Sequence, residues 1–285
     1  METVGLDYAI SCFLAGMERE TRRIYRHWIQ EWLAWCRENA LDPSAVGREH
    51  IEGYIRWMRD VRGISKASVR SRVSPVCCLY RYAREEGIIA VDPGEHVRYP
   101  RVYGHSTGTY LTREEAARFL GCALAKGDDA LALCRVLLLC GLRISEALGI
   151  DVEDYDAGRK TVTIRKRKGD WSQTVSVSSA VAASFDALAA RRSTGPMIRA
   201  GGKRMPAKRA RGIVASVAEG AGLEGVTPHS LRRTFATLSR DAGVPDRDII
   251  ASGGWGSQRM LDYYDMARRG ATSTAPEELE KYLNL

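Results

Sequence analysis

Apolar residues recur at intervals of three or four in three stretches near the start of the chain. The first stretch carries Tyr25, Trp28, Ile29, Trp32, Leu33 and Cys36, the second Ile51, Tyr54, Ile55, Met58 and Val61, and the third Val69, Val73, Cys77 and Tyr80. This spacing places each set on one face of a helix. We therefore predict a domain of amphipathic helices in residues 1–91.

Arginines lie on these helices away from the apolar faces. Arg70 and Arg72 are examples on the third helix, which we expect to run from about Ser65 to Glu86. Such arginines are usually solvated surface, but a helical domain that binds DNA phosphates needs the same arrangement. The pattern leaves both interpretations open.

The helical periodicity stops in residues 92–110, where prolines and several glycines predict a linker between domains. A second domain, expected over residues 111–270, begins with Thr112 and Glu115 in a capping box. The segment from Asp129 to Cys140 is apolar on nearly all sides, which predicts a buried helix.

Residues Thr161–Arg165 and Thr174–Val177 alternate apolar and polar positions with a period of two and are joined by KRKGDWSQ. This pattern predicts a β-hairpin whose tip carries Arg165, Lys166 and Lys168. A run of basic residues is usually solvated, although a hairpin is stiff enough to hold one ammonium group in place. The predicted fold class is mainly α with a small β-hairpin.

A further helix is expected after Pro228, with Leu231, Phe235 and Leu238 on its apolar face. His229 and Arg232 are three residues apart and share a side of this helix. Taken alone, a His-x-x-Arg pair is more often a cap or a surface contact.

Glycines and a proline divide the rest of this stretch into shorter elements. Gly243 ends the first helix, Pro245 opens a second, and the Gly253-Gly254 pair breaks it ahead of Trp255. An earlier pair, Arg143 and Glu146, shares one helix face and reads by itself as a surface ion pair.

The chain has 43 Lys plus Arg against 35 Asp plus Glu, a net charge of +8 and a pI near 9.2. This balance is compatible with an acidic partner such as nucleic acid, but equally with a basic protein that has none. Seven cysteines without a C-x-x-C motif suggest reduced thiols, and no leader or membrane span is expected.

Taken together, these motifs strongly resemble the tyrosine recombinases of the phage integrase family. The residues that carry the resemblance are Leu142-Arg-Ile-Ser-Glu-Ala-Leu148, Lys168-Gly169, His229-Ser-Leu-Arg-Arg-Thr-Phe-Ala-Thr237, Gly253-Gly-Trp255 and Tyr264. The first domain is similar to the helical core-binding domain of the family. The resemblance implies a two-domain architecture in which a mixed α/β catalytic domain follows that helical domain.

The resemblance also implies a role for each matched residue. Arg143, Lys168, His229, Arg232, Trp255 and Tyr264 would be catalytic, with Glu146 orienting Arg143. Tyr264 is preferred to Tyr263 as nucleophile because it follows Trp255 by nine residues, as in the family. Lys168 is preferred to Lys166 because it precedes a glycine, and Trp255 stands where many members have histidine.

These residue types suit DNA strand transfer. Two guanidiniums can bind the charge that develops on an attacked phosphodiester, and a lysine can protonate the leaving 5′-oxygen. A tyrosine hydroxyl, with a pKa near 10, needs a base and a cationic field to attack. The expected intermediate is a 3′-phosphotyrosyl link, formed without ATP, metal or cofactor.

The expected partner is double-stranded DNA carrying recombination sites, and we expect neither a membrane nor a small-molecule substrate. Predicted DNA contacts outside the catalytic set are Arg70, Arg72, Arg165, Lys166, Lys203 and Arg204. The resemblance suggests a homotetramer on DNA, monomeric or weakly associated when free, with a tail helix in residues 271–285 exchanged between protomers. It also suggests a cytoplasmic, nucleoid-associated protein of a prokaryote or phage.

Three other interpretations are weighed. A type IB topoisomerase uses similar Arg, Lys, His and Tyr chemistry, and a regulator of the same fold would bind DNA without cleaving it. An unrelated basic helical protein would have to match five motifs by coincidence. The biological role, whether integrase, resolvase, transposon recombinase or chromosome-dimer recombinase, is not readable, nor is the target sequence.

Overall fold

The computed structural model describes residues 5–101, 109–165, 172–269, 280 and 282, with the backbone alone for 264–269. Its contacts divide the chain into two compact units, Met1–Tyr103 and Gly104–Leu285. Each unit has its own hydrophobic core, so the two are described separately.

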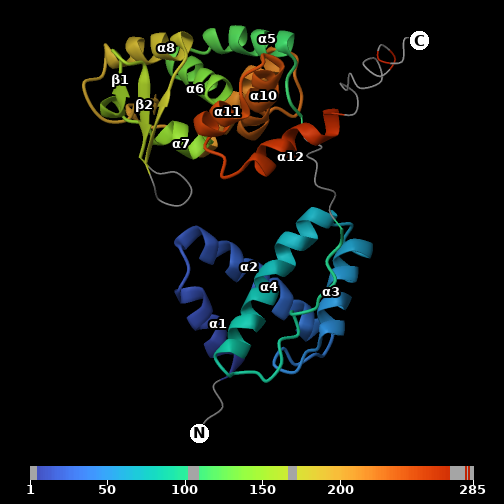
Figure 1. Cartoon of the computed structure of the whole chain (residues 1–285). Coiled ribbons are helices and arrows are strands. Elements are labelled where there is room, and N and C mark those ends of the chain that lie inside the picture. The colour runs from blue at the N-terminus through green and yellow to red at the C-terminus, as the bar shows by residue number, and fades with distance from the viewer. Residues whose placement is uncertain (1–4, 102–108, 166–171, 270–279, 281, 283–285) are drawn as a thin grey trace. The chain divides into compact units, whose positions relative to one another are not determined.

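The described residues of unit 1 form four helices (Figure 1). These are α1 (Leu6–Ala15), α2 (Arg19–Glu38), α3 (Arg48–Asp60) and α4 (Lys66–Glu85). The periodicity predicted α2, α3 and α4 but not α1. The sequence of α1 is apolar around most of its circumference, so it lacks the polar face that makes an amphipathic helix recognisable.

Aromatic side chains hold the centre of unit 1 together. Trp32 is fully buried, and its indole Nε1 donates to the hydroxyl of Tyr80 at 2.9 Å. That hydroxyl donates in turn to the carbonyl of Pro43 at 2.8 Å. The chain of hydrogen bonds satisfies two polar groups inside the core and joins α2, α4 and the α2–α3 loop.

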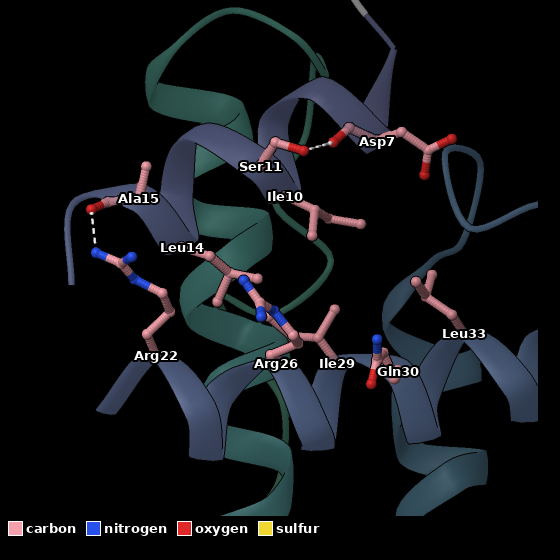
Figure 2. A pocket seen from close by; sticks show the side chains of 10 residues that line it. All are labelled: Asp7, Ile10, Ser11, Leu14, Ala15, Arg22, Arg26, Ile29, Gln30 and Leu33. Carbon is pink, nitrogen blue, oxygen red and sulfur yellow. Dashed lines mark hydrogen bonds between the residues drawn. The ribbon is translucent and has the colours of Figure 1, made fainter. Parts of the chain in front are cut away.

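A hollow of about 440 Å³ lies between α1 and α2 (Figure 2). Figure 2 shows the apolar side chains Ile10, Leu14 and Ile29 along it, and Arg22 reaching the C-terminal end of α1. Arg22 donates to the carbonyls of Ala15 and Met17, each at 2.8 Å. This arginine therefore satisfies the last carbonyl of helix α1, that of Ala15, and a carbonyl of the turn that follows.

The described part of unit 2 combines helices with two small sheets. Its helices are α5 (Arg113–Leu124), α6 (Asp128–Leu139), α7 (Ile144–Gly149), α8 (Ser179–Ala189), α9 (Ala207–Gly220), α10 (Pro228–Asp241), α11 (Asp246–Gly253) and α12 (Gln258–Arg269), with a 3₁₀ turn η1 (Val152–Asp154). The apolar helix α6 contacts α5, α7, α8, α9 and α10 and forms the centre of the core (Figure 1). The prediction that this helix is buried is confirmed.

The larger sheet has the strand order β1 (Tyr155–Asp156), β2 (Thr161–Ile164) and β3 (Gln173–Ser176). Strands β2 and β3 pair antiparallel, from Thr161 opposite Ser176 to Ile164 opposite Gln173. The predicted hairpin is confirmed, but its tip, with Lys166 and Lys168, lies outside the described residues. The expectation of a mainly helical chain with a small β-hairpin is confirmed as well.

The two-stranded sheet β4 (Arg199–Ala200) and β5 (Lys203–Arg204) was not predicted. The core of unit 1 extends into the first half of the predicted linker, residues 92–110, and the core of unit 2 begins directly after it. Val97 is buried in unit 1, and Leu111 is buried in unit 2, where its backbone N–H donates to Thr234.

The seven cysteines are free thiols, of which four are buried. Burial raises the pKa of the Cys134 thiol to about 12, so this thiol stays neutral. Among the described residues, no helix is long and apolar enough to span a bilayer.

Candidate active site

A tight reversal after helix α6 places Arg143. Gly141 has φ +63°, and a Cβ there would lie 2.3 Å from the ring of Phe235, so glycine fits both the backbone and the space. Arg143 follows in extended conformation as the N-cap of α7. The turn points its side chain toward α10 and α11, where it meets the carbonyl of Gly254.

Glu146 holds the guanidinium of Arg143 in place. Its carboxylate accepts the backbone N–H of Arg143 at 2.9 Å and Nη1 of the same residue at 2.8 Å. The Glu146 side chain is 2% exposed, whereas that of Arg143 is 29% exposed. A buried carboxylate thus fixes a guanidinium that still reaches solvent.

Arg232 lies on α10 and is buried. Its Nη1 donates to the carbonyls of Gly141 and Gly253, and its Cζ lies 4.0 Å from the ring centroid of Trp255. Both terminal nitrogens of Arg143 donate to the carbonyl of Gly254 at 3.3 Å. Because Gly253 and Gly254 are consecutive residues, the two guanidiniums converge on one short piece of backbone.

The Gly-Gly-Trp motif explains this close approach. A Cβ on Gly253 would lie 1.9 Å from the ring of Trp255, so a side chain there would displace the indole. Gly254 ends α11 in the left-handed conformation with φ +66°, which favours glycine. Trp255 is buried and stacks on Phe235 with an interplanar angle of 5°. The indole therefore forms one wall of the Arg232 site.

His229 lies in the first turn of α10 and is exposed to solvent. Desolvation by the surrounding protein lowers the pKa of its imidazole, and the positive charges of Arg233, Arg232 and Arg143 lower this pKa further. Since Arg143 comes from α7 and the others from α10, His229 stands within the electrostatic reach of both arginine-bearing helices. A neutral imidazole is the form able to accept a proton.

Arg233 points to a different part of unit 2 from Arg232. Its Nη1 donates to the carbonyl of Thr109 at 3.3 Å, at the start of the described part of unit 2. The structure thus brings Arg232, and not its neighbour, to the carbonyls beside Trp255.

Lys168 and Lys166 lie outside the described residues, and for Tyr264 the structure gives only the backbone, within α12. Tyr263 is 41% exposed. The assignments of acid and nucleophile therefore stay predictions.

An ion-pair cluster fixes α12, although the sequence did not single it out. Arg240 on α10 donates to Asp246 at the start of α11 at 2.7 Å and to Asp262 on α12 at 2.9 Å. Leu261 packs with Trp255 in a small apolar cluster. The spacing of residues gave no signal for Asp262, because its partner Arg240 is remote in sequence. Asp262 lies two residues before Tyr264, so this ion pair links the helix of the candidate nucleophile to α10.

A hollow of about 680 Å³ opens beside Arg143, with Arg165 and Arg204 on its walls. These two residues were predicted to contact DNA, but both are engaged within the protein. Arg165 pairs with Asp154 at 2.6 Å and with Asp151 at 3.2 Å. Arg204 pairs with Asp151 at 2.6 Å, whereas the neighbouring Lys203 is exposed.

The predicted DNA contacts of unit 1 lie over aromatic rings. The Cζ of Arg70 is 5.2 Å from the ring centroid of Tyr99, and that of Arg72 is 4.4 Å from Trp28. Arg72 also lies 3.7 Å from the carboxylate of Glu31.

Among the described residues no cluster of three His, Cys, Asp or Glu could hold a metal ion.

Models of two protein families match the chain. A model of the phage integrase family matches residues 109–269, and one of the phage integrase N-terminal SAM-like domain matches residues 9–88. Tyrosine recombinase XerD of Mycobacterium leprae is 29% identical over 252 residues, covering 79% of each chain. Tyrosine recombinase XerC of Corynebacterium efficiens is 29% identical over 212 residues, covering 71% of this chain and 68% of that protein.

Solved structures share the fold. A lambda integrase dimer bound to a COC′ core site superimposes with a TM-score of 0.73 at 17% identity, covering 92% of this chain and 77% of that one. The Tn1549 transposon integrase in complex with circular intermediate DNA gives a TM-score of 0.72 at 16% identity, covering 94% and 99%. The predicted two-domain architecture is confirmed at the level of the fold.

Proposed function

The chain belongs to the phage integrase family and is a site-specific tyrosine recombinase, and we propose that it cleaves and rejoins DNA with the residues gathered around Gly253 and Gly254. One observation carries the proposal: Arg143 and Arg232, from different helices, donate to the carbonyls of these consecutive glycines. Two guanidiniums that converge in this way can bind both non-bridging oxygens of one phosphodiester.

We call Arg143 and Arg232 the clamp, and it acts on charge that develops during the reaction. Attack on the phosphorus adds negative charge to the non-bridging oxygens, and guanidiniums already held by Glu146 and by the glycine carbonyls stabilise it without having to reorganise. The stacked pair of Trp255 and Phe235 limits the positions open to Arg232.

In the proposed reaction the phenolic oxygen of Tyr264 forms a bond to phosphorus as the bond from phosphorus to the 5′-oxygen breaks. Neutral His229 accepts the phenolic proton, consistent with its lowered pKa. Lys168 donates a proton to the departing 5′-oxygen. The product is a 3′-phosphotyrosyl link that a second 5′-hydroxyl can attack, so rejoining needs no ATP.

Unit 1 is proposed to bind the same DNA through its basic helices, with Arg70 and Arg72 contacting phosphates. Their aromatic neighbours restrict each guanidinium to one direction, which lowers the entropy lost on binding. Lys203 is a further proposed contact from unit 2, since it is exposed.

Four copies are proposed to assemble on two duplexes, each receiving the tail of a neighbour. The tail sequence carries Leu279, Tyr282 and Leu283 at helical spacing and is acidic. A groove of about 330 Å³ among α5, α6 and α10 has apolar walls with Arg113 at one edge, which suits such a segment. Truncation before Pro276 should then weaken tetramers in analytical ultracentrifugation while sparing binding to a single site.

The proposed function is tested with a plasmid that carries two copies of the target site. A recombinase yields Holliday junctions and exchanged products, and these should disappear when one site is removed. A type IB topoisomerase would instead relax both plasmids without exchange. A protein that binds both plasmids without cleaving either would contradict the proposed chemistry.

A further inference from the structure

Arg165 is the first residue after strand β2, just beyond the last ladder pair of Ile164 with Gln173. It lies three residues before Lys168, the proposed proton donor. The contacts that fix Arg165 therefore also fix the point at which the hairpin tip begins. The inference drawn from this position rests on the proposed function, in which Lys168 protonates the 5′-oxygen.

Two carboxylates hold the Arg165 guanidinium. Its Nε donates to Asp154 at 2.6 Å and its Nη1 to Asp151 at 3.2 Å. The Asp154 side chain is 5% exposed, and its second oxygen accepts the backbone N–H of Asp151 at 2.9 Å. A guanidinium held through two different nitrogens is fixed in orientation as well as in position.

The same carboxylates link Arg165 to the helix that presents Arg143. Arg204 donates to Asp151 at 2.6 Å and to the carbonyl of Leu148 at 2.6 Å, and Leu148 belongs to α7. Arg143 is the N-cap of α7. One continuous set of hydrogen bonds thus joins the base of the hairpin to the element that places the first clamp residue.

The hollow beside Arg143 shows that these groups face a common space. Arg143 and Glu146 lie on its α7 side, and Thr163 and Arg165 lie on its β2 side. Helix α7 and the end of β2 are neighbours in unit 2 (Figure 1). Arg165 with Asp154 and Asp151, which we call the anchor, is therefore adjacent to the clamp, where a proton donor is needed.

We propose that Arg165, held by Asp154 and Asp151, is a positioning residue that delivers the hairpin lysine to the leaving 5′-oxygen, and is not a phosphate contact. The Arg165 side chain is 54% exposed, but its Nε is bound to Asp154, which is 5% exposed, and its Nη1 to Asp151, which is 15% exposed. Moving the guanidinium to a phosphate would leave the buried Asp154 carboxylate without its cation.

The test replaces the 5′-bridging oxygen of the scissile phosphate with sulfur. A thiolate leaves without a proton, because a thiol has a pKa of about 8.5 and an alcohol is far less acidic. Loss of the proton donor therefore slows the oxygen substrate and spares the sulfur substrate. Single-turnover cleavage is measured for both substrates at saturating protein, so that differences in DNA affinity do not enter.

Arg165→Ala should slow cleavage of the oxygen substrate by about 10- to 100-fold, part of the ~10²- to 10⁴-fold that a general acid contributes. Cleavage of the sulfur substrate should stay within about threefold of the unsubstituted protein, since the acid is not needed there. Because Arg165→Ala leaves a buried carboxylate uncompensated, the double variant Arg165→Met/Asp154→Asn is measured beside it and should show the same split.

Arg159→Ala is the matched control. Arg159 also pairs with an aspartate of this sheet, Asp156, but its side chain is 85% exposed. Both substrates should be cleaved at unchanged rates. Lys168→Ala is the benchmark, and sulfur should rescue it.

Equal slowing of both substrates by Arg165→Ala and by the double variant would overturn the inference, because the anchor would then serve the whole site. Unchanged rates on both substrates, with weaker binding, would also overturn it and return Arg165 to the phosphate contacts. If Lys168→Ala itself is not rescued, Lys168 is not the acid, and that part of the proposed function falls together with the inference.

Discussion

Arginines are held differently in the two units. In unit 1, Arg70 and Arg72 lie over aromatic rings, and the Arg72 side chain is 23% exposed beside Glu31. In unit 2, Arg232 is 3% exposed and binds two backbone carbonyls. These two arginines of unit 1 are oriented at the surface, whereas Arg232 is buried in the interior of unit 2.

The difference has an energetic consequence. A contact between an exposed arginine and a phosphate is screened by solvent and contributes about 1 kcal/mol or less, so losing one changes affinity by a few-fold. A preorganised donor aimed at developing charge contributes about 3 to 4 kcal/mol to the barrier, which changes rates by orders of magnitude. Substitutions in the two units should therefore differ both in size and in the step they affect.

The largest expected effect in this comparison is that of Arg232→Lys. Lysine keeps the charge but lacks the planar guanidinium. A single ammonium group cannot stack on the Trp255 ring and at the same time donate to the carbonyls of Gly141 and Gly253. Single-turnover cleavage should fall by about 100- to 1000-fold, with site affinity changed less than threefold. Loss of affinity with a normal cleavage rate would remove the distinction between the two units.

A smaller effect is expected from Arg240→Met, which removes the link from α10 to Asp246 and Asp262. Helix α12 should then hold Tyr264 less precisely and slow cleavage by about tenfold, the cost of one charged hydrogen bond of about 1.4 kcal/mol. Oxygen and sulfur leaving groups should be slowed alike, since the nucleophile acts on both. A rescue by sulfur would assign Arg240 to the proton donor instead.

The acid limb of the pH–rate profile reports His229. Its pKa is lowered by desolvation and by nearby arginines, so the neutral base persists below its usual value of about 6.5, and kcat/KM should fall only at still lower pH. Arg233→Gln removes one of these charges, raises the His229 pKa and should move the limb to higher pH. The limb is measured as kcat/KM against pH, and a shift to lower pH would contradict the assignment.

The smallest effect is expected from Arg72→Ala in unit 1. It should weaken site binding a few-fold at 100 mM salt and reduce the slope of log affinity against log salt by about one, the loss of one phosphate contact. Arg159→Ala is the control, because Arg159 pairs with Asp156 in unit 2 and is not among the predicted DNA contacts. An unchanged slope for Arg72→Ala would show that this arginine serves Glu31 and Trp28 alone.

Local patterns predicted the elements that depend on local sequence. Helices with one apolar stripe, such as α2, and the hairpin with its period of two were both found from spacing. Helix α1 was missed because it lacks a polar face, and β4 and β5 because two-residue strands have no period.

The candidate site was predictable in its residue types and not in its contacts. The break at Gly253 and Gly254 could be read from composition, but their carbonyls as acceptors for two arginines could not. The partners of Arg165 and Arg240 are carboxylates brought close by folding, so no spacing rule identifies them. For the same reason the sequence could not show that Arg165 is bound by Asp154 and Asp151.

The most direct test maps the covalent link between protein and DNA. A nicked site that releases a short fragment on cleavage would trap the adduct, and peptide mass spectrometry would locate the modified residue. The account predicts phosphotyrosine at Tyr264, its loss in Tyr264→Phe with site binding retained, and a persistent adduct in Tyr263→Phe. An adduct that survives Tyr264→Phe would contradict the assignment of the nucleophile on which the proposed reaction rests.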